Sequence, residues 1–309
     1  MGRKNVASAM DKLIAVLRRR GFIYPGSHIY GGFANSFDYG PLGAQMKDNI
    51  IQKWKRDFVT RRPENVLINT AVITNPAVWQ ASGHVELFED VFVCCSHCGD
   101  RHRVDHLVES VEPASMSLDE IHSGIGEAKP KCPSCGSKKG GFDFPQNFNL
   151  LFKTTVGTST DSGATAYLRP ETAQGAYINF SNVIGSAPNR RLPLGVGQVG
   201  KSFRNEISPR NYIFRTREFE QMELQYYCNP TEAAQHFTHW VDHIQKWLLD
   251  LGLRSDELRF EIHSPEQLAH YAVQTTDIEF KYPFGWGEVR SCRRHNSGCT
   301  VIHDVVLDD

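Results

Sequence analysis

The chain of 309 residues is 40% hydrophobic and 22% charged, enough apolar sequence for the core of one large domain or two ordinary ones. Its 34 Lys and Arg residues nearly balance its 35 Asp and Glu residues, and the net charge of -1 excludes a basic surface over the whole molecule as a means of binding nucleic acid. No run of about 18 apolar residues occurs, and the N-terminal segment is too charged for the apolar centre of a signal peptide. We therefore expect a cytoplasmic protein that does not contact a membrane.

Helices are predicted in the first sixty residues. Residues 8–20 place apolar side chains at helical spacing and end in a basic turn before Gly21, which predicts an amphipathic helix. An apolar residue at every fourth position predicts a long helix over 44–59. These residues are Met46, Ile50, Trp54 and Phe58. Such a stripe is typical of a core or of a contact between subunits. A short strand is expected at 66–68.

Residues 91–145 differ in composition and hold five of the eight cysteines, so we interpret them as an insertion into the main domain. Two C-x-x-C pairs lie 33 residues apart in it: Cys95 with Cys98, and Cys132 with Cys135. In a cytoplasmic protein this spacing indicates a structural zinc site with four thiolates and no open position for water. Four buried thiols are the alternative, and Cys94 makes the ligand set ambiguous. A zinc-ribbon that binds nucleic acid would need a larger basic cluster than Lys131, Lys138 and Lys139.

Strand-like alternation dominates the second half of the chain. Residues 194–227 alternate on both sides of a polar loop and predict a long antiparallel hairpin. A buried stripe with an N-cap and proline at its start predicts a helix that ends at Gly252. Its members are Phe237, Trp240, Ile244 and Leu248. A strand at 258–263, a short helix after Pro265 and a strand at 276–282 complete the expected order.

The second strand of the hairpin has one unusually polar face. Alternation places Arg217, Phe219, Gln221 and Glu223 on that face, with Glu218, Glu220, Met222, Leu224 and Tyr226 on the other. Charged groups on a central strand cost several kcal/mol unless they are paired or face a wet cavity, so this face is typical of a binding floor. An exposed edge hairpin with surface ion pairs is the alternative.

The hairpin sequence carries a resemblance to a known family. KSFRNE (201–206) and FRTREFEQMEL (214–224) resemble motif 2 of the class II aminoacyl-tRNA synthetases, in its glycyl form. YLRPETAQG (167–175) is similar to a second block of the glycyl enzymes, although by itself it is only a turn into a helix. YGGFANSFDYGPLG (30–43) with Thr74-Asn75-Pro76 resembles their motif 1, which implies a homodimer. The match runs from about Gly21 to Glu288.

The resemblance implies an α+β protein with the class II catalytic fold, in which helices flank an antiparallel sheet and a zinc-binding segment is inserted. The implied division is 1–90 with motif 1, the insertion 91–145, a catalytic core 146–288 with motif 2, and a divergent tail 289–309. The tail is set apart because similarity ends at one residue, with no counterpart of motif 3 or of the anticodon-binding domain.

The implied activity is that of a glycine–tRNA ligase, which joins glycine to tRNA(Gly) through glycyl-adenylate with ATP and Mg²⁺. Arg204 and Glu206 are the implied catalytic residues, because a planar guanidinium suits bidentate contact with the α-phosphate. The ATP contacts implied are Arg204, Asn205, Glu206, Phe214, Arg215, Thr216, Arg217, Glu218, Phe219, Glu288 and Val289. The glycine contacts implied are Arg103, Glu171, Phe219, Glu220, Gln221, Met222 and Glu223.

Glycine must be selected by exclusion of larger side chains while its ammonium is held, because a missing methyl is worth only about 1 to 3 kcal/mol. Glu171, Gln221 and Glu223 are our candidates for the ammonium cage. The alternative is a catalytically inactive, synthetase-like protein that binds or dimerises. Retention of the motif 2 residues favours the enzyme, and loss of motif 3 favours the inactive form.

Overall fold

A computed structural model describes residues 8–108, 110–113, 115–138, 141–157, 163–207, 211–269, 271–296 and, by its backbone, 299–305. The chain divides into two compact units. Unit 1 comprises Met1–Val72, Glu171–Ser202 and Asn211–Asp309, and unit 2 comprises Ile73–Pro170 and Phe203–Arg210. Residues 208–210 of the predicted hairpin loop, and Lys139, lie outside the described residues.

Unit 1 is built on a seven-stranded sheet with the order β12-β13-β14-β15-β11-β10-β3. Its strands are β3 (Asn65–Ile68), β10 (Leu194–Phe203), β11 (Glu218–Tyr227), β12 (Leu258–Ile262), β13 (Ala272–Tyr282), β14 (Gly285–His295) and β15 (Cys299–Val305). The edge strand β3 runs parallel to β10, and the pairs from β11 through β15, β14 and β13 to β12 are antiparallel. The predicted hairpin is confirmed as the neighbouring strands β10 and β11.

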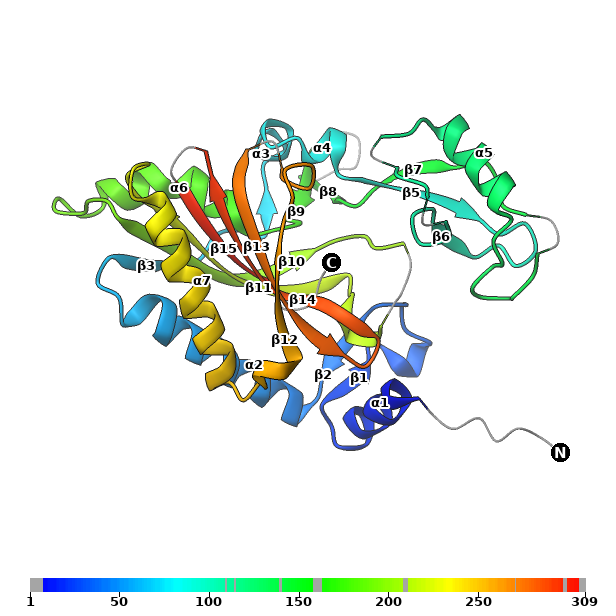
Figure 1. Cartoon of the computed structure of the whole chain (residues 1–309), viewed down its shortest axis with the longest axis horizontal. Helices are drawn as coiled ribbons and strands as arrows, with labels where there is room; N and C mark the ends of the chain where they lie inside the picture. The colour runs from blue at the N-terminus through cyan, green and yellow to red at the C-terminus, as the bar shows by residue number, and fades with distance from the viewer. Residues whose placement is uncertain are drawn as a thin grey trace. The chain divides into compact units, whose positions relative to one another are not determined.

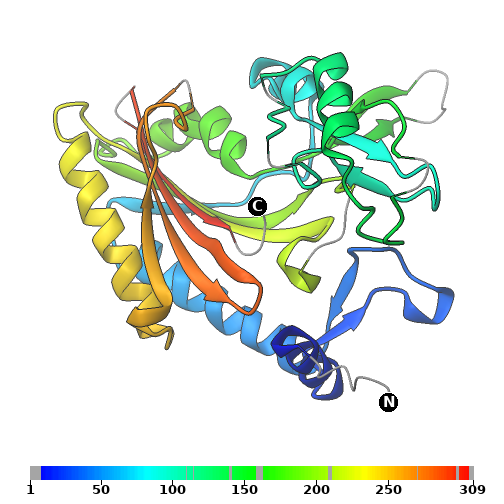
Figure 2. The same cartoon turned by 45° about the vertical axis from the view of Figure 1, so that its right-hand side comes forward.

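Helices cover both faces of this sheet (Figures 1 and 2). On one face, α2 (Pro41–Trp54), the π-helical η2 (Lys55–Thr60) and α7 (Ala233–Asp250) enclose the main core. Its fully buried side chains include Trp54, Phe58, Trp240, Ile244 and Leu248, which confirms the stripe of α7 as core. The first predicted stripe is core only at Trp54 and Phe58, because Ile50 is partly buried and Met46 is 56% exposed. On the other face, α6 (Ala173–Gly185) packs Ala176 and Val183 on Val196 of β10. The main core therefore lies on the first face, and a smaller apolar cluster lies under α6 on the second.

The remaining elements of unit 1 are short. Helix α1 (Ala9–Arg19) begins at Ser8, whose hydroxyl accepts from the Asp11 amide in a capping box. Strands β1 (Ile23–Pro25) and β2 (Phe37–Tyr39) pair in an antiparallel ribbon. The 3₁₀ turns η1 (His28–Tyr30), η3 (Tyr212–Phe214) and η4 (Ser255–Glu257) complete this unit.

Unit 2 contains two three-stranded sheets. One is formed by β4 (Ile73–Thr74), β9 (Ala164–Leu168) and β8 (Phe152–Val156), and the other by β6 (Arg101–Arg103), β5 (Glu89–Cys94) and β7 (Gln146–Asn149). Its helices are α3 (Pro76–Ala81), α4 (His84–Leu87) and α5 (Leu118–Ala128). Val93, Val104 and Ile121 are fully buried in a core of their own. The predicted insertion lies wholly within this unit.

Two expectations for the second half of the chain were wrong. Pro265 begins a turn rather than a helix. The segment after Glu288 continues β14 and supplies β15, which pairs with β11 and β14 in the middle of the sheet. Within β14, Arg290 occupies a core position: it is 2% exposed, and its guanidinium lies 4.3 Å from the ring centroid of Trp247. A hydrophobic pattern cannot register an arginine that is buried against an aromatic ring.

Among the described residues, no helix is both long enough and apolar enough to cross a membrane.

Candidate functional site

The polar face of β11 in unit 1 has the alternation that was predicted. Gln221 and Glu223 are each 2% exposed, and both lie on the α6 side of the sheet. Met222 and Leu224 point to the opposite face, where they join the core under α7. A buried carboxylate and a buried amide on one central strand are costly unless other groups bond to them.

Thr172, at the start of α6, supplies those bonds. Its amide donates to Oε1 of Gln221 (3.0 Å) and its hydroxyl donates to Oε2 of Glu223 (2.6 Å). The Ser202 hydroxyl on β10 donates to the same oxygen of Gln221 (2.9 Å). Threonine at a helix N-cap usually turns its hydroxyl back to the helix, but here the cap has no side-chain bond. The hydroxyl is used for the strand instead, so helix and strand are joined at the carboxylate.

Glu171 lies one residue before this junction. It is half-buried, and the Gln174 side chain donates to its Oε1 over 2.6 Å. Glu171 and Glu223 thus present two carboxylates within unit 1, each oriented by a neutral donor. A ligand with a positive charge would stabilise both carboxylates as anions.

Three of the side chains expected at the site lie instead on the face of the sheet that α2 and α7 cover. Glu220 forms an ion pair with Lys47 of α2 (2.7 Å), and Met222 and Val289 pack in or against the core under α7. Val289 sits at a β-bulge where the register between β13 and β14 shifts. These three side chains point away from the face that carries Gln221 and Glu223.

The residues expected around the nucleotide have varied surroundings in unit 1. Phe214 is buried and its ring centroid lies 5.0 Å from that of Tyr282 and 4.8 Å from that of Phe284. Burial and the charge of Glu288 raise the pKa of Tyr282 to about 12. The guanidinium of Arg217 donates to the carbonyl of Ala34 (2.6 Å).

The other nucleotide candidates of unit 1 differ in exposure. Phe219 and Thr216 are buried, Arg215 is half-buried, and Glu218 is exposed in an ion pair with Lys201.

In unit 2, Arg204 and its neighbours follow the end of β10. The Arg204 guanidinium lies over the ring of Phe88 (5.5 Å to the centroid), and its Nε donates to the carbonyl of Pro170 (3.2 Å). The amide of Asn205 donates to the carbonyl of Leu150 (2.8 Å), and Glu206 is 4% exposed. Cation–π contact and a bond to a carbonyl both hold this guanidinium in place.

Arg103 of unit 2 is differently placed. Its guanidinium forms ion pairs with Asp90 (3.1 Å) and Asp105 (2.8 Å). Burial alone would raise the pKa of Asp105, but hydrogen bonding to Arg103 and its charge lower it. The two carboxylates offset the positive charge of this arginine.

The four cysteines of unit 2 converge. All four Sγ atoms lie within 4.8 Å of one another, with 3.7 Å between Cys98 and Cys132 and 3.9 Å between Cys95 and Cys135. Zinc bonded tetrahedrally at about 2.3 Å to each sulfur would hold the sulfurs about 3.8 Å apart, so the cluster fits that ion. Gly99 (φ 76°) and Gly136 (φ 69°) form matching left-handed turns after each pair. Backbone N–H groups of Cys98 and His97 lower the pKa of Cys95 to about 7.

Sequence reasoning missed His102 at this cluster. Its Nε2 lies 3.4 Å from Sγ of Cys132, and the residue is only 9% exposed. Once the thiol loses its proton, the imidazole N–H is the only donor in this pair. One histidine between two arginines carries no spacing signal, so the contact appears only in three dimensions.

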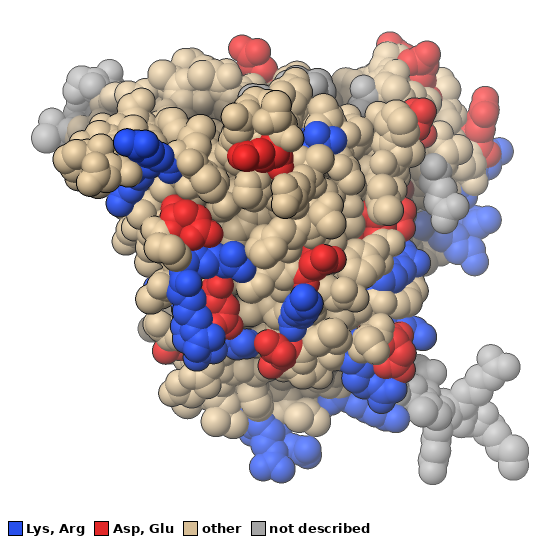
Figure 3. Space-filling model, turned by 60° about the vertical axis from the view of Figure 1, so that its left-hand side comes forward, with Lys and Arg blue, Asp and Glu red and all other residues tan. Residues whose placement is uncertain are grey.

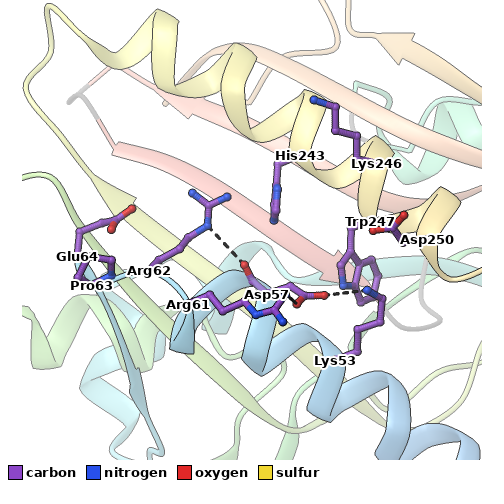
Figure 4. Close-up of a pocket in the computed structure, with 10 residues that line it drawn as sticks. All are labelled: Lys53, Asp57, Arg61, Arg62, Pro63, Glu64, His243, Lys246, Trp247 and Asp250. Atoms are coloured by element: carbon purple, nitrogen blue, oxygen red, sulfur yellow. Dashed lines mark hydrogen bonds and ion pairs between the residues drawn. The ribbon is translucent and has the colours of Figure 1, made fainter.

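A further cavity of unit 1, of about 540 Å³, lies between η2 and α7 (Figure 4). Among its charged residues, Asp57 accepts from Lys53 (2.8 Å), Arg56 (3.0 Å) and Arg61 (3.4 Å). Burial, with the charge of Arg62, lowers the pKa of His243 to about 4. Basic and acidic side chains are interspersed on the face of the molecule drawn in Figure 3. An ion-pair cluster around Asp57 thus forms part of the lining of this cavity.

Comparison with known proteins places these groups in context. A family model for the tRNA synthetase class II core domain (G, H, P, S and T) matches residues 152–292. The chain is 46% identical over 292 residues to a glycine–tRNA ligase of Caldanaerobacter subterraneus subsp. tengcongensis and 47% identical over 292 residues to one of Acetivibrio thermocellus. Each alignment covers 92% of this chain and 63% of the relative. The chain thus spans somewhat less than two thirds of the length of these relatives.

Among solved structures, the chain is similar to one described as the RNA binding domain of threonyl-tRNA synthetase from Cryptosporidium parvum Iowa II. The TM-score is 0.58 at 14% identity, over 96% of this chain and 68% of the other. At that identity the likeness shows the fold alone, and the fold it shows is the mixed α+β arrangement that was expected.

Proposed function

This chain belongs to the glycine–tRNA ligase family of class II aminoacyl-tRNA synthetases, and we propose that it activates glycine with ATP and transfers the glycyl group to tRNA(Gly). The membership rests on relatives 46% and 47% identical over 92% of the chain. The activity, the substrates and the partners of the whole protein are our inference from that membership and from the groups described above.

The observation that carries the proposal is the buried carboxylate of Glu223. It is 2% exposed, and the Thr172 hydroxyl at the start of α6 donates to it and fixes its orientation. An α-ammonium group supplies both a positive charge and further N–H donors. Glu171 and Gln221 are the other members of the proposed ammonium site, and its close surroundings would exclude larger amino acids by clash.

Activation uses the complex of ATP with Mg²⁺ as substrate. A carboxylate oxygen of glycine attacks the α-phosphorus, the bond from that phosphorus to the bridging oxygen breaks, and pyrophosphate leaves with the electron pair. Arg204 is proposed to bind the α-phosphate and to neutralise the charge that develops on it. A hydroxyl at the tRNA 3′ end then attacks the glycyl carbonyl and AMP leaves. Neither step needs a covalent enzyme intermediate, so orientation and charge are what the protein contributes.

Three further features belong to the same proposal. The cluster of Cys95, Cys98, Cys132 and Cys135 is proposed to hold a structural zinc ion, because the sulfur spacing fits and four thiolates leave no place for substrate. A homodimer is proposed from the resemblance of α2 and its flanking strands to motif 1. We place the reaction in the cytoplasm, where tRNA and ATP meet.

Glycine-dependent ATP–pyrophosphate exchange tests the proposal. The purified chain should incorporate labelled pyrophosphate into ATP when glycine is present, and Arg204→Ala should reduce that rate by at least about a hundred-fold. Arg254→Ala is the matched control, because Arg254 is a surface arginine paired with Asp256. A folded wild-type chain that binds neither glycine nor ATP and shows no exchange would establish the alternative, a synthetase-like protein without catalysis.

A further inference from the structure

Gln198 on β10 is a fully buried carboxamide in unit 1 that no part of the proposed reaction uses. It is 1% exposed and lies on the same face of the sheet as Gln221 and Glu223. Its Oε1 accepts from the amide of Thr70 (3.0 Å) and from the Thr70 hydroxyl, and its Nε2 donates to the carbonyl of Thr172 (2.7 Å). Its side-chain bonds thus link the residues after β3 to the start of α6.

Thr172 is consequently bonded through all three of its polar groups. The carbonyl accepts from Gln198, the amide donates to Gln221, and the hydroxyl donates to Glu223. A residue held at three points has little freedom to rotate about its own bonds. The orientation of the Glu223 carboxylate is therefore set by Thr172, and that of Thr172 by Gln198.

The close approach of α6 shows that this junction is tightly fitted. A Cβ at Gly175, in the first turn of α6, would lie 2.3 Å from the Thr70 hydroxyl oxygen and 3.1 Å from Nε2 of Gln198. Glycine at this place lets the helix end come down onto the Gln198 amide. A larger residue would lift the helix and stretch the bond from Gln198 to the Thr172 carbonyl.

We infer that Gln198 is a positioning residue for glycine recognition: through Thr172 it fixes the Glu223 carboxylate that meets the ammonium group. This inference rests on the proposed function and names the residues that prepare its ammonium site. Gln198 does not touch the substrate in this scheme, so it is not a catalytic residue. We call the hydrogen-bonded chain of Thr70, Gln198, Thr172 and Glu223 the relay. Thr70 belongs to it because Thr70 donates to Oε1 of Gln198, which leaves Nε2 to donate to Thr172.

Gln225 provides a matched control within the same sheet. It is also 1% exposed, on the same face of β11, and it accepts a hydrogen bond from the Tyr177 hydroxyl (2.9 Å) rather than bonding to Thr172. Gln198→Met and Gln225→Met each remove one buried carboxamide at nearly constant volume. Both substitutions should lower the midpoint of thermal unfolding, whereas only Gln198→Met should raise the KM for glycine.

Two readouts test the relay. Hydrogen exchange followed by mass spectrometry or NMR should show faster exchange at the Thr172 amide in Gln198→Met than in Gln225→Met, whether or not the chain is active. In pyrophosphate exchange, the KM for glycine should rise by about ten-fold or more in Gln198→Met, with the KM for ATP unchanged. Thr70→Val should give the same pattern, and Thr70→Ser, which keeps the hydroxyl, should restore the wild-type KM.

The outcomes distinguish a failure of the relay from a failure of the proposed function. Equal exchange at the Thr172 amide in both methionine variants, or an equal change in the KM for glycine, would overturn the relay while the proposed function stands. A wild-type chain that does not bind glycine would overturn the proposed function, and with it the assigned role of Gln198. Faster exchange at Thr172 together with a selective rise in the KM for glycine supports both.

Discussion

At the scale of single residues, the face on which a side chain lies decides its role. Glu220 and Glu223 are three positions apart on β11, and both are acidic. Glu220 forms an ion pair with Lys47 on the face that α2 and α7 cover, while Glu223 accepts from Thr172 on the face that α6 covers. Strand alternation alone separates these two faces, because neighbouring side chains point in opposite directions.

The placement of Glu220 and Glu223 on opposite faces leads to a prediction. Glu223→Gln should raise the KM for glycine by at least about ten-fold, since the neutral amide loses its attraction for an ammonium group. Glu220→Gln should leave that KM within about two-fold and lower only stability, by about 1 kcal/mol or less, because a partly exposed ion pair is worth little. Steady-state pyrophosphate exchange and urea unfolding measure the two effects. Equal changes in KM from both variants would contradict the assignment of faces.

His102 supports a second prediction at this scale. A zinc ion with four thiolates carries excess negative charge, and an N–H donor to the Cys132 sulfur offsets part of it. His102→Phe should therefore weaken metal binding by roughly 10- to 100-fold. Competition with a chelator measures the affinity, and the charge-transfer bands of the Co²⁺ form should shift. His97→Phe is the control, because that side chain is exposed on the same turn; an equal loss in both variants would rule out the N–H donor.

At the scale of elements, α7 and the strands that it covers supply most of the residues in the main core of unit 1. Trp240, Ile244 and Leu248 are each at most 1% exposed and face β11, β13 and β14. The helix is long and strongly amphipathic, so its position was predictable from spacing. What spacing could not show is that the facing strands include β14, whose core position is filled by Arg290.

Truncation on α7 tests this core. Ile244→Ala should reduce the free energy of unfolding by about 2 to 5 kcal/mol, because it removes a side chain that is completely enclosed. Val241→Ala, at a partly buried position of the same helix, should cost less than about 1.5 kcal/mol. Urea titration followed by tryptophan fluorescence compares the two. A cost at Ile244 no larger than at Val241 would be incompatible with the observed burial.

At the scale of the whole molecule, stability depends on pH through local groups although the net charge is close to zero. Burial holds the pKa of His243 at about 4, whereas an unfolded histidine titrates near 6.5. The unfolded chain therefore binds a proton between these values that the folded chain does not. Stability from this group is complete above about pH 6.5 and is lost as the pH falls toward 4.

Unfolding at several pH values checks that sign. The free energy of unfolding should fall from pH 7 to pH 5. In His243→Phe the slope of that free energy against pH should be shallower, by up to about the slope that the uptake of one proton on unfolding produces. His28→Phe, at an exposed position, should keep the wild-type slope. If His243→Phe and the wild type decline in parallel, the imidazole is not excluded from protonation by folding.

Sequence by itself determined the resemblance to the class II aminoacyl-tRNA synthetases, the polar face of β11, the apolar stripe of α7 and the pairing of the four cysteines. Each depends on local periodicity or on a short spacing, which survives without knowledge of distant contacts. Only the tertiary structure decided that Thr172 turns its hydroxyl from its own helix to Glu223, that Gln198 reaches Thr172, and that His102 meets Cys132. It also decided that residues after Glu288 form central strands. Each of these contacts joins residues that are far apart in the chain. A buried polar group bonds to whichever donor or acceptor the fold brings near it, and no local sequence pattern records that.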